Sequence, residues 1–293
     1  MNNRLPGCSH SAGMDSLLPA NGKMLAGNRI IRETTMVRPK KHLGQHFLTD
    51  PGIAERITGS LTLEHAQALL EIGPGKGVLT QFLKGRDDID FYLVEIDNEA
   101  VEFLRKEYPA LGDHLIGADF LRLDLSQFGE RVAIIGNFPY NISSQIFFKV
   151  LDNRDRVPEV VGMIQKEVAE RLISGPGTKR YGILSVFLQA WYNISYLFTV
   201  NPGSFFPPPK VKSSVIRLER NGRTSLGCDE ALFRRVVKTA FNQRRKMMRN
   251  SLASLLVNLD REDPVFTRRP EELGVEEFIR LTQKIESQNT HSY

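Results

Sequence analysis

One short segment, Asn137-Phe138-Pro139-Tyr140, carries groups that could act together on an amino nitrogen. The Asn137 side-chain oxygen and the Phe138 carbonyl oxygen could accept both N–H groups of an adenine amine. The nitrogen would then become pyramidal, with its lone pair aimed at a methyl donor, and no strong general base would be required. Pro139 would stiffen the segment, and Tyr140 would offer a face on which a flipped-out base could stack. The tetrapeptide alone is a weak signal because such a pattern often arises by chance.

A glycine-rich segment, Glu71-Ile72-Gly73-Pro74-Gly75-Lys76-Gly77, follows an apolar run and precedes a helical pattern. Glycines at such a place allow a tight turn and let a ligand approach the backbone, although an ordinary strand-to-helix turn has the same pattern. Pro74 lacks an amide that a pyrophosphate would bind, and the GxGxG spacing differs from the dinucleotide motif. Glu95, 22 residues after Gly73, could accept hydrogen bonds from both hydroxyls of a ribose. The two features favour S-adenosylmethionine over NAD.

A second acidic residue, Asp119, follows the next apolar run in Gly117-Ala118-Asp119-Phe120. At the carboxyl end of a strand it would line the ligand crevice of an open sheet, where it could accept a hydrogen bond from an adenine amino group. An aspartate that caps a turn is the alternative, and it is favoured for this residue taken alone.

Alternating strands and helices must position these segments. Strands are predicted at residues 68–72, 91–96, 114–116, 132–136 and 160–165, with helices at 78–84 and 98–107. Near-continuous apolar strands separated by helices indicate an α/β fold, a Rossmann-like parallel sheet covered on both faces. Residues 195–200 and 213–218 flank a Pro-rich loop and are predicted to form an antiparallel edge pair. Helices are predicted at 229–240, 243–259 and 271–286.

Charge and composition divide the chain into three parts. Residues 1–35 are rich in Asn, Gly, Ser and Pro, carry a net charge of +2, and are predicted to be a disordered extension. Residues 36–220 have no net charge and are predicted to form the Rossmann-like methyltransferase domain. Residues 221–293, with a net charge of +3, are predicted to form a small all-helical RNA-binding domain.

The composition also excludes several classes of protein. Of 293 residues, 41% are hydrophobic and 25% are charged, values of ordinary globular proteins rather than disordered or fibrous ones. Cys8 and Cys228 lie far apart, which excludes a disulfide framework or a cysteine zinc site, and no metal site is expected. No apolar run approaches the roughly 18 residues of a membrane span. We therefore expect a cytoplasmic protein without a membrane partner.

A series of short motifs spans the chain from about residue 40 to about residue 285. In order they are Leu43-Gly44-Gln45-His46-Phe47-Leu48, Glu71-Ile72-Gly73-Pro74-Gly75, Val94-Glu95-Ile96-Asp97, Gly117-Ala118-Asp119, Asn137-Phe138-Pro139-Tyr140-Asn141-Ile142-Ser143-Ser144, Phe205-Phe206-Pro207-Pro208-Pro209-Lys210-Val211 and Phe241-Asn242-Gln243-Arg244-Arg245-Lys246. Each is short, but in this order they resemble the family of ribosomal RNA adenine N6-dimethyltransferases.

The resemblance implies roles for particular residues. The implied contacts to S-adenosylmethionine are His46, Leu48, Gly73, Glu95, Asp119 and Asn137. Asn137 and Tyr140 would form the adenine site, with Phe205 as a second stacking wall. The sequence departs from the family at two positions, because His46 stands where the family commonly has Asn and Phe138 replaces the usual Leu.

Residues 231–259 contain seven basic side chains and no acidic one. Asn242 is predicted to cap a helix whose first turn would hold Arg244, Arg245 and Lys246. The helix dipole disfavours cations there by about 0.3–1 kcal/mol each, so their presence indicates a compensating phosphate ligand. Further RNA contacts are expected at Arg249 and at Lys210 and Lys212 beside the Pro-rich loop. An ordinary charged helix face is the alternative.

The resemblance implies a function: dimethylation of N6 on two adjacent adenines near the 3′ end of 16S rRNA. The substrate would be a small-subunit assembly intermediate, and the enzyme would act as a monomer. A methylase of 23S rRNA, of the kind that confers macrolide resistance, is one alternative. A noncatalytic RNA-binding assembly factor is another, against which the intact segment 137–140 argues.

Overall fold

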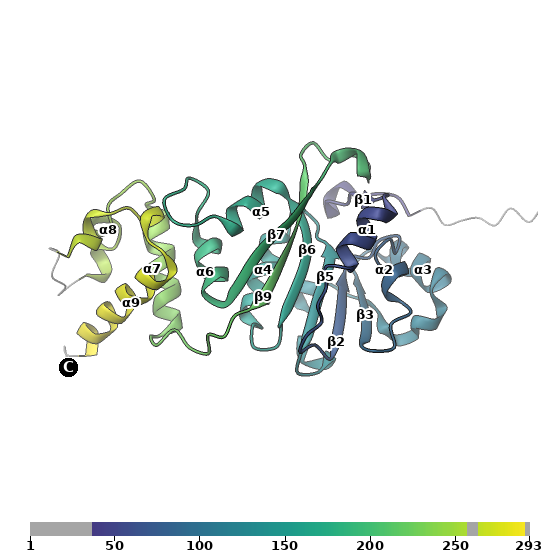
Figure 1. Cartoon of the computed structure of the whole chain (residues 1–293), viewed down its shortest axis with the longest axis horizontal. Coiled ribbons are helices and arrows are strands. Elements are labelled where there is room, and N and C mark those ends of the chain that lie inside the picture. Colours follow the sequence, from purple (N-terminus) through teal and green to yellow (C-terminus); the bar gives the residue numbers. More distant parts are fainter. Residues whose placement is uncertain (1–36, 257–262, 291–293) are drawn as a thin grey trace, which may run out of the picture. The chain divides into compact units, whose positions relative to one another are not determined.

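A seven-stranded sheet lies at the centre of the computed structural model, which describes residues 37–256 and 263–290 (Figure 1). The strand order is β4-β3-β2-β5-β6-β9-β7. The bounds are β2 (Ala68–Ile72), β3 (Asp90–Glu95), β4 (Leu115–Gly117), β5 (Val132–Asn137), β6 (Glu159–Gln165), β7 (Tyr192–Val200) and β9 (Ser213–Arg220). The predicted disordered extension, residues 1–35, lies outside the described residues.

Neighbouring strands from β4 to β6 run parallel, and β9 and β7 pair antiparallel at one edge. The parallel strands are largely buried, as their near-continuous apolar sequences predict, except for the edge strand β4, in which only Leu115 is buried. The predicted Rossmann-like sheet and its antiparallel edge pair are therefore confirmed.

The α-helices are α1 (Pro51–Thr58), α2 (Thr80–Leu83), α3 (Asn98–Glu107), α4 (Ser143–Asp152), α5 (Lys166–Ile173), α6 (Ile183–Trp191), α7 (Glu230–Asn242), α8 (Met248–Ser251) and α9 (Val275–Thr290). The 3-10 helices span Lys41–Leu43, Pro109–His114, Phe120–Arg122, Leu125–Phe128, Pro202–Ser204, Ala253–Leu255, Pro264–Thr267 and Pro270–Glu272. Among the described residues, none of these helices has the length and apolar character needed to cross a membrane.

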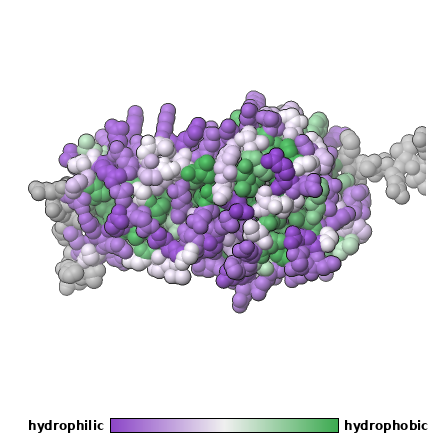
Figure 2. Space-filling model, in the orientation of Figure 1, coloured by the Kyte–Doolittle hydropathy of each residue, from purple (hydrophilic) through white to green (hydrophobic). Residues whose placement is uncertain are grey.

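Side chains alternate between the two faces of the sheet, and each face has its own hydrophobic core. Leu69 packs in a cluster with residues of α1, α2 and α3, and the next residue, Leu70, packs with residues of α4, α5 and α6. Burial on both faces fixes the register of the strands and so the position of the loops that follow them. On the face shown in Figure 2, the remaining hydrophobic areas are separated by hydrophilic residues.

A second, two-stranded sheet joins distant parts of the sequence. In it β1 (Phe47–Leu48) pairs antiparallel with β8 (Phe205–Phe206). The N-terminal segment is thereby held beside the Pro-rich loop, which we define as residues 201–212.

The C-terminal helices continue the core of one face of the sheet. Phe187 of α6 contacts Phe233 of α7 with ring centroids 6.0 Å apart, and both belong to the same buried cluster. Arg154 and Glu230 form an ion pair of 2.7 Å between the segment after α4 and the start of α7. The helical character expected after residue 220 is present, while the division into domains stays a prediction.

The single helix predicted over residues 243–259 is wrong. Asn242 is the last residue of α7 rather than an N-cap, and residues 243–246 form a turn. The chain becomes extended at Met247, after which the short helix α8 begins. Met248 is fully buried, and its N–H donates to the Arg268 carbonyl oxygen at 2.8 Å, so a tertiary contact prevails over the helical pattern. Residues 257–259 lie outside the described part of the chain.

This turn removes the reason given for a phosphate site on Arg244, Arg245 and Lys246. The three side chains follow the C-terminus of α7 and do not lie in the first turn of a helix. A helix C-terminus favours cations, so their position needs no compensating anion.

We predict that Gly136→Ala weakens both the fold and the site beside it. A Cβ at Gly136 of β5 would lie 2.6 Å from the Ile72 carbonyl oxygen of β2 and 2.9 Å from the Phe138 ring. Because the first neighbour is backbone, the strands must shift, which we expect to lower the free energy of unfolding by about 1–3 kcal/mol. Urea denaturation measures this, with Gly85→Ala, which meets nothing within 4 Å, as the control. Equal stability of the two variants would contradict the prediction.

Candidate active site

A pocket of about 170 Å³, which we call the strand-edge pocket, lies at the carboxyl ends of β2, β3, β4 and β5. These strands are parallel neighbours, so the residues that end them meet at one edge. The chain reverses its winding between β2 and β5, and open α/β sheets bind ligands at such a switch point. The predicted residues that line it are His46, Gly73, Glu95, Asp119 and Asn137.

The glycine loop after β2 contacts the carboxylate of Glu95. Gly73 and Gly75 have φ values of 64° and 57°, in the left-handed region that favours glycine. The Gly75 N–H donates to one oxygen of Glu95 at 3.0 Å, and the Asp97 N–H donates to the other at 2.9 Å. Burial raises the pKa of Glu95, and these amide donors oppose the rise. Each oxygen keeps a lone pair, so two neighbouring hydroxyl groups of a ligand could also be bound.

Asp97 holds the N-terminal segment in place. Its carboxylate accepts hydrogen bonds from Lys40 Nζ at 2.6 Å and Gln45 Nε2 at 3.1 Å, and it also caps α3. Burial alone would raise the pKa of Asp97, but the hydrogen bonds from Lys40 and Gln45 lower it overall. The segment that carries His46 is thereby fixed at the rim of the strand-edge pocket.

Asp119 combines the two roles between which the sequence left the choice open. Its Oδ1 accepts the Leu121 N–H at 2.9 Å and so caps a 3-10 turn, while the residue also lines the strand-edge pocket. Lys149 of α4 braces the same turn by donating to the carbonyl oxygens of Leu121 and Leu123, at 3.1 and 2.5 Å.

The Asn137 amide has a defined orientation. Its Nδ2 donates to the His46 carbonyl oxygen at 2.8 Å, and only the nitrogen of the amide can make that bond. The Oδ1 atom accepts no hydrogen bond from the residues that the structure describes, so an acceptor is available at the end of β5. The Phe138 ring is buried next to Phe147, and the Phe138 N–H donates to Met163 O at 3.0 Å.

Tyr140 is held from two sides. Its ring stacks on His46 with centroids 5.3 Å apart, and its hydroxyl lies 2.5 Å from Ser213 Oγ. Burial raises the pKa of Tyr140, so the phenol stays neutral. The His46 Nδ1 lies 2.8 Å from the carbonyl oxygen of Pro207 in the Pro-rich loop.

Three predicted residues do not line the strand-edge pocket: Tyr140, Leu48 and Phe205. Leu48 and Phe205 face each other across the β1–β8 pair, and both are only 4% exposed. The neighbouring Phe206 is 60% exposed and is the aromatic ring that the Pro-rich loop presents to solvent.

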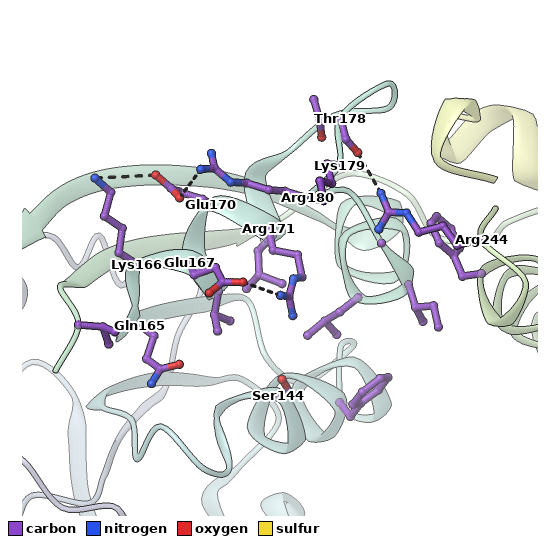
Figure 3. Close-up of a pocket in the computed structure, with 18 of the residues that line it drawn as sticks. Ser144, Gln165, Lys166, Glu167, Glu170, Arg171, Thr178, Lys179, Arg180 and Arg244 are labelled. Carbon is purple, nitrogen blue, oxygen red and sulfur yellow. Dashed lines mark hydrogen bonds and ion pairs between the residues drawn. The ribbon is translucent and has the colours of Figure 1, made fainter. Parts of the chain in front are cut away.

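A larger groove of about 1480 Å³, the basic groove, lies between α5, the start of α6 and the end of α7 (Figure 3). Seven basic side chains line it, against the two acidic ones Glu167 and Glu170: Lys166, Arg171, Lys179, Arg180, Lys212, Lys238 and Arg244. Ser144 also lines it four residues after Tyr140, and Lys212 directly precedes Ser213. The basic groove therefore adjoins the segment 137–140.

Of the basic residues predicted to bind RNA, Arg244 and Lys212 are among the residues that line the basic groove. The guanidinium of Arg244 donates to the Thr178 carbonyl oxygen at 3.1 Å (Figure 3). It also lies 3.5 Å from a Glu271 oxygen. The others, Arg245, Lys246, Arg249 and Lys210, are exposed.

Comparison with known proteins places the chain among enzymes. Residues 36–283 match the family described as ribosomal RNA adenine dimethylase. The chain belongs to this family. A Bacteroides thetaiotaomicron protein named ribosomal RNA small subunit methyltransferase A is 55% identical over 86% of this chain and 95% of its own length. A Parabacteroides distasonis protein of the same name is 57% identical over 84% and 94%.

Solved structures agree on the fold. A dimethyladenosine transferase from Plasmodium falciparum superposes with a TM-score of 0.70 at 22% identity, over 83% of this chain and 98% of that one. The 23S rRNA methyltransferase ErmE superposes with a TM-score of 0.58 at 25% identity, over 81% of this chain and 99% of that one. The sheet is therefore that of the S-adenosylmethionine-dependent methyltransferases, as predicted.

For this rRNA adenine dimethylase, sequence analysis missed part of the basic groove. Lys166 lies on α5, and Lys179 and Arg180 lie in the loop before α6. The run Gly175-Pro176-Gly177-Thr178-Lys179-Arg180 could have been noticed as a basic loop between two helices.

A buried acid beneath the strand-edge pocket predicts a pH dependence of stability. Glu71 of β2 is 1% exposed and accepts a hydrogen bond from Thr80 Oγ1 at 2.8 Å. Burial raises its pKa from the ordinary 4.5 to about 8. Between these values the folded protein keeps the proton and the unfolded chain loses it. Stability therefore falls as pH rises through this window, by at most about 1.4 kcal/mol per pH unit.

We predict that Glu71→Gln reduces this fall of stability with rising pH, because glutamine does not titrate and keeps an oxygen acceptor for Thr80. Urea denaturation between about pH 5 and pH 8 should show a smaller fall in the free energy of unfolding than the wild type shows. The control is Glu102→Gln, which removes an exposed glutamate of α3. Parallel pH profiles for Glu71→Gln and the wild type would contradict the assignment.

Proposed function

We propose that this chain transfers methyl groups from S-adenosylmethionine to N6 of two adjacent adenines near the 3′ end of 16S rRNA. Its substrate is an assembly intermediate of the small ribosomal subunit, and it acts as a monomer in the cytoplasm. The observation that carries the proposal is the fixed amide of Asn137, whose oxygen is available at the end of β5 beside the strand-edge pocket. The relatives named as small-subunit methyltransferases support this choice of RNA.

The strand-edge pocket fits the cofactor that the family implies. Glu95 has lone pairs for the ribose hydroxyls, Asp119 offers an acceptor for the adenine amine, and Gly73 leaves the backbone open because a Cβ there would meet nothing within 4 Å. Ile96 and Phe120 add apolar surface to the same lining. The full set proposed to hold the cofactor is His46, Leu48, Gly73, Glu95, Asp119 and Asn137. Leu48, being buried, would contribute through its backbone.

S-adenosylmethionine, when bound, supplies an electrophilic methyl group. The protein's part is to hold the target amine: Asn137 Oδ1 and the Phe138 carbonyl oxygen accept its two N–H groups and direct its lone pair toward the cofactor. The amine becomes acidic only once it is alkylated, so its proton can pass to solvent without a strong base. Tyr140 stacks on the base, and Phe205 supports the opposite wall from the β1–β8 pair.

The basic groove supports RNA as the substrate. Its excess of cations could contact several phosphates, and it begins beside Tyr140, where the target base would enter. Exposed Lys210, Arg245, Lys246 and Arg249 would extend these contacts, together with Arg244.

The alternatives are less well supported. The solved 23S rRNA methyltransferase is 25% identical to this chain, whereas the small-subunit relatives exceed 50%. A noncatalytic assembly factor would not need an oriented Asn137 amide at the strand-edge pocket.

We predict that Asn137→Ala abolishes methyl transfer while binding of RNA is largely retained. The protein is incubated with labelled S-adenosylmethionine and small subunits that lack the modification, beside modified subunits and 23S rRNA. Wild-type enzyme should place label in N6-dimethyladenosine of the unmodified 16S rRNA alone. Label in 23S rRNA would overturn the proposed substrate, and transfer by Asn137→Ala would overturn the proposed role of the amide.

We predict that Lys212→Ala combined with Lys238→Ala weakens RNA binding and its dependence on salt. Each lost phosphate contact should make the plot of log affinity against log salt concentration shallower by about 0.7 to 1. Fluorescence anisotropy with a 16S fragment at several salt concentrations measures this slope. Arg105→Ala, which removes an exposed basic side chain of α3, is the control. An unchanged slope in the double variant would exclude phosphate binding by these two lysines.

A further inference from the structure

One residue of the active site contacts two loops that come from distant parts of the sequence. The His46 Nδ1 lies 2.8 Å from the Pro207 carbonyl oxygen, and its ring stacks on Tyr140. Because a carbonyl oxygen only accepts, Nδ1 must carry the hydrogen and donate it. The ring therefore bridges the Pro-rich loop and the segment 137–140.

The backbone of the same residue holds the catalytic amide, because the His46 carbonyl oxygen accepts the hydrogen bond from Asn137 Nδ2. The segment around His46 is itself anchored to α3, through the contacts of Lys40 and Gln45 with Asp97. Through His46, the segment anchored to α3 therefore contacts Asn137, Tyr140 and the Pro-rich loop.

We propose that His46 is a positioning residue for the target adenine, and that its Nδ1–H bond to Pro207 holds the Pro-rich loop against Tyr140. The loop carries buried Phe205 and exposed Phe206, so this bond, together with the β1–β8 pair, sets where their rings lie relative to Tyr140. The inference rests on the proposed function and assigns His46 a role in holding the base, besides any contact with the cofactor.

The target base must be held correctly in two successive transfers, because N6 receives two methyl groups. In each transfer the nitrogen lone pair forms the new N–C bond, the S–C bond of the donor breaks, and one proton leaves the nitrogen. After the first transfer the nitrogen carries a methyl group and one N–H, and it must present its lone pair again in the same site. A loosely held Pro-rich loop should therefore slow the second transfer more than the first and release N6-monomethyladenine.

Two substitutions separate the contacts of the ring. His46→Phe keeps an aromatic ring but loses the N–H donor, whereas His46→Asn keeps an amide N–H near the Nδ1 position and loses the ring. For His46→Phe we expect the second transfer to slow by about fivefold and monomethyladenine to accumulate, since one hydrogen bond contributes about 1 kcal/mol. At saturating S-adenosylmethionine, His46→Asn should slow the second transfer less than His46→Phe does, because the asparagine keeps an N–H donor.

His114→Phe is the matched control. The His114 Nδ1 also contacts a carbonyl oxygen, that of Phe91 at 2.8 Å, and its ring also stacks, on Tyr92 with centroids 4.3 Å apart. It precedes β4 and so lies at the amino ends of the strands, away from the strand-edge pocket. Its substitution should leave the rate and the product ratio unchanged.

Hydrogen exchange of the full chain, without RNA, gives a readout that does not depend on activity. In His46→Phe the amides of residues 203–206 should exchange faster than in the wild type, and in His46→Asn they should not. Unchanged exchange and an unchanged product ratio in His46→Phe would overturn the inference. It would also be overturned if both variants slowed the second transfer equally at saturating S-adenosylmethionine. Faster hydrogen exchange in His46→Phe, together with no methyl transfer by the wild type, would contradict the proposed function but still support the contact between His46 and the Pro-rich loop.

Discussion

The parallel register of β2, β3, β4 and β5 is the constraint on which the rest of the structure depends. The central strands β2 and β5 are buried on both faces, so they cannot slip by a residue without exposing apolar side chains, and β3 and β4 pair in register beside β2. Since the strands run in one direction, the polar residues that follow their apolar runs must meet at one edge. Gly73, Glu95, Asp119 and Asn137 lie together for this reason, although 64 residues separate the first from the last.

Register brings these residues together, but other contacts orient their functional groups. Glu95 is held by two backbone amides and Asn137 by a backbone carbonyl. Such partners resist rearrangement because the backbone they belong to is itself part of the fold. The candidate active site is therefore largely formed before any ligand arrives, which would reduce the reorganisation needed when methyl transfer begins.

The sequence was most informative where a chemical signal coincided with the end of an apolar strand. The strands, the antiparallel edge and the residues of the strand-edge pocket could be predicted because both signals are local. The helix over 243–259 could not be excluded, because the turn after Asn242 depends on docking of Met248 against the segment around Arg268. The basic groove was missed in part because its cations come from four separate segments and meet only in the folded chain. The burial of Phe205 likewise depends on its pairing with β1.

The ring of Phe138 fills the space beside Gly136 and Gly162, where neither residue has a side chain, and these two positions differ in the substitutions they could tolerate. A Cβ at Gly136 would collide with the backbone of β2, so no change of a neighbouring side chain could make room for it. A Cβ at Gly162 of β6 would have the Phe138 ring as its three nearest neighbours, beginning at 2.5 Å. Position 162 can therefore diverge only in concert with position 138, as a compensating pair. The Phe138 side chain of the segment 137–140 thus limits which residues can occupy position 162 of β6.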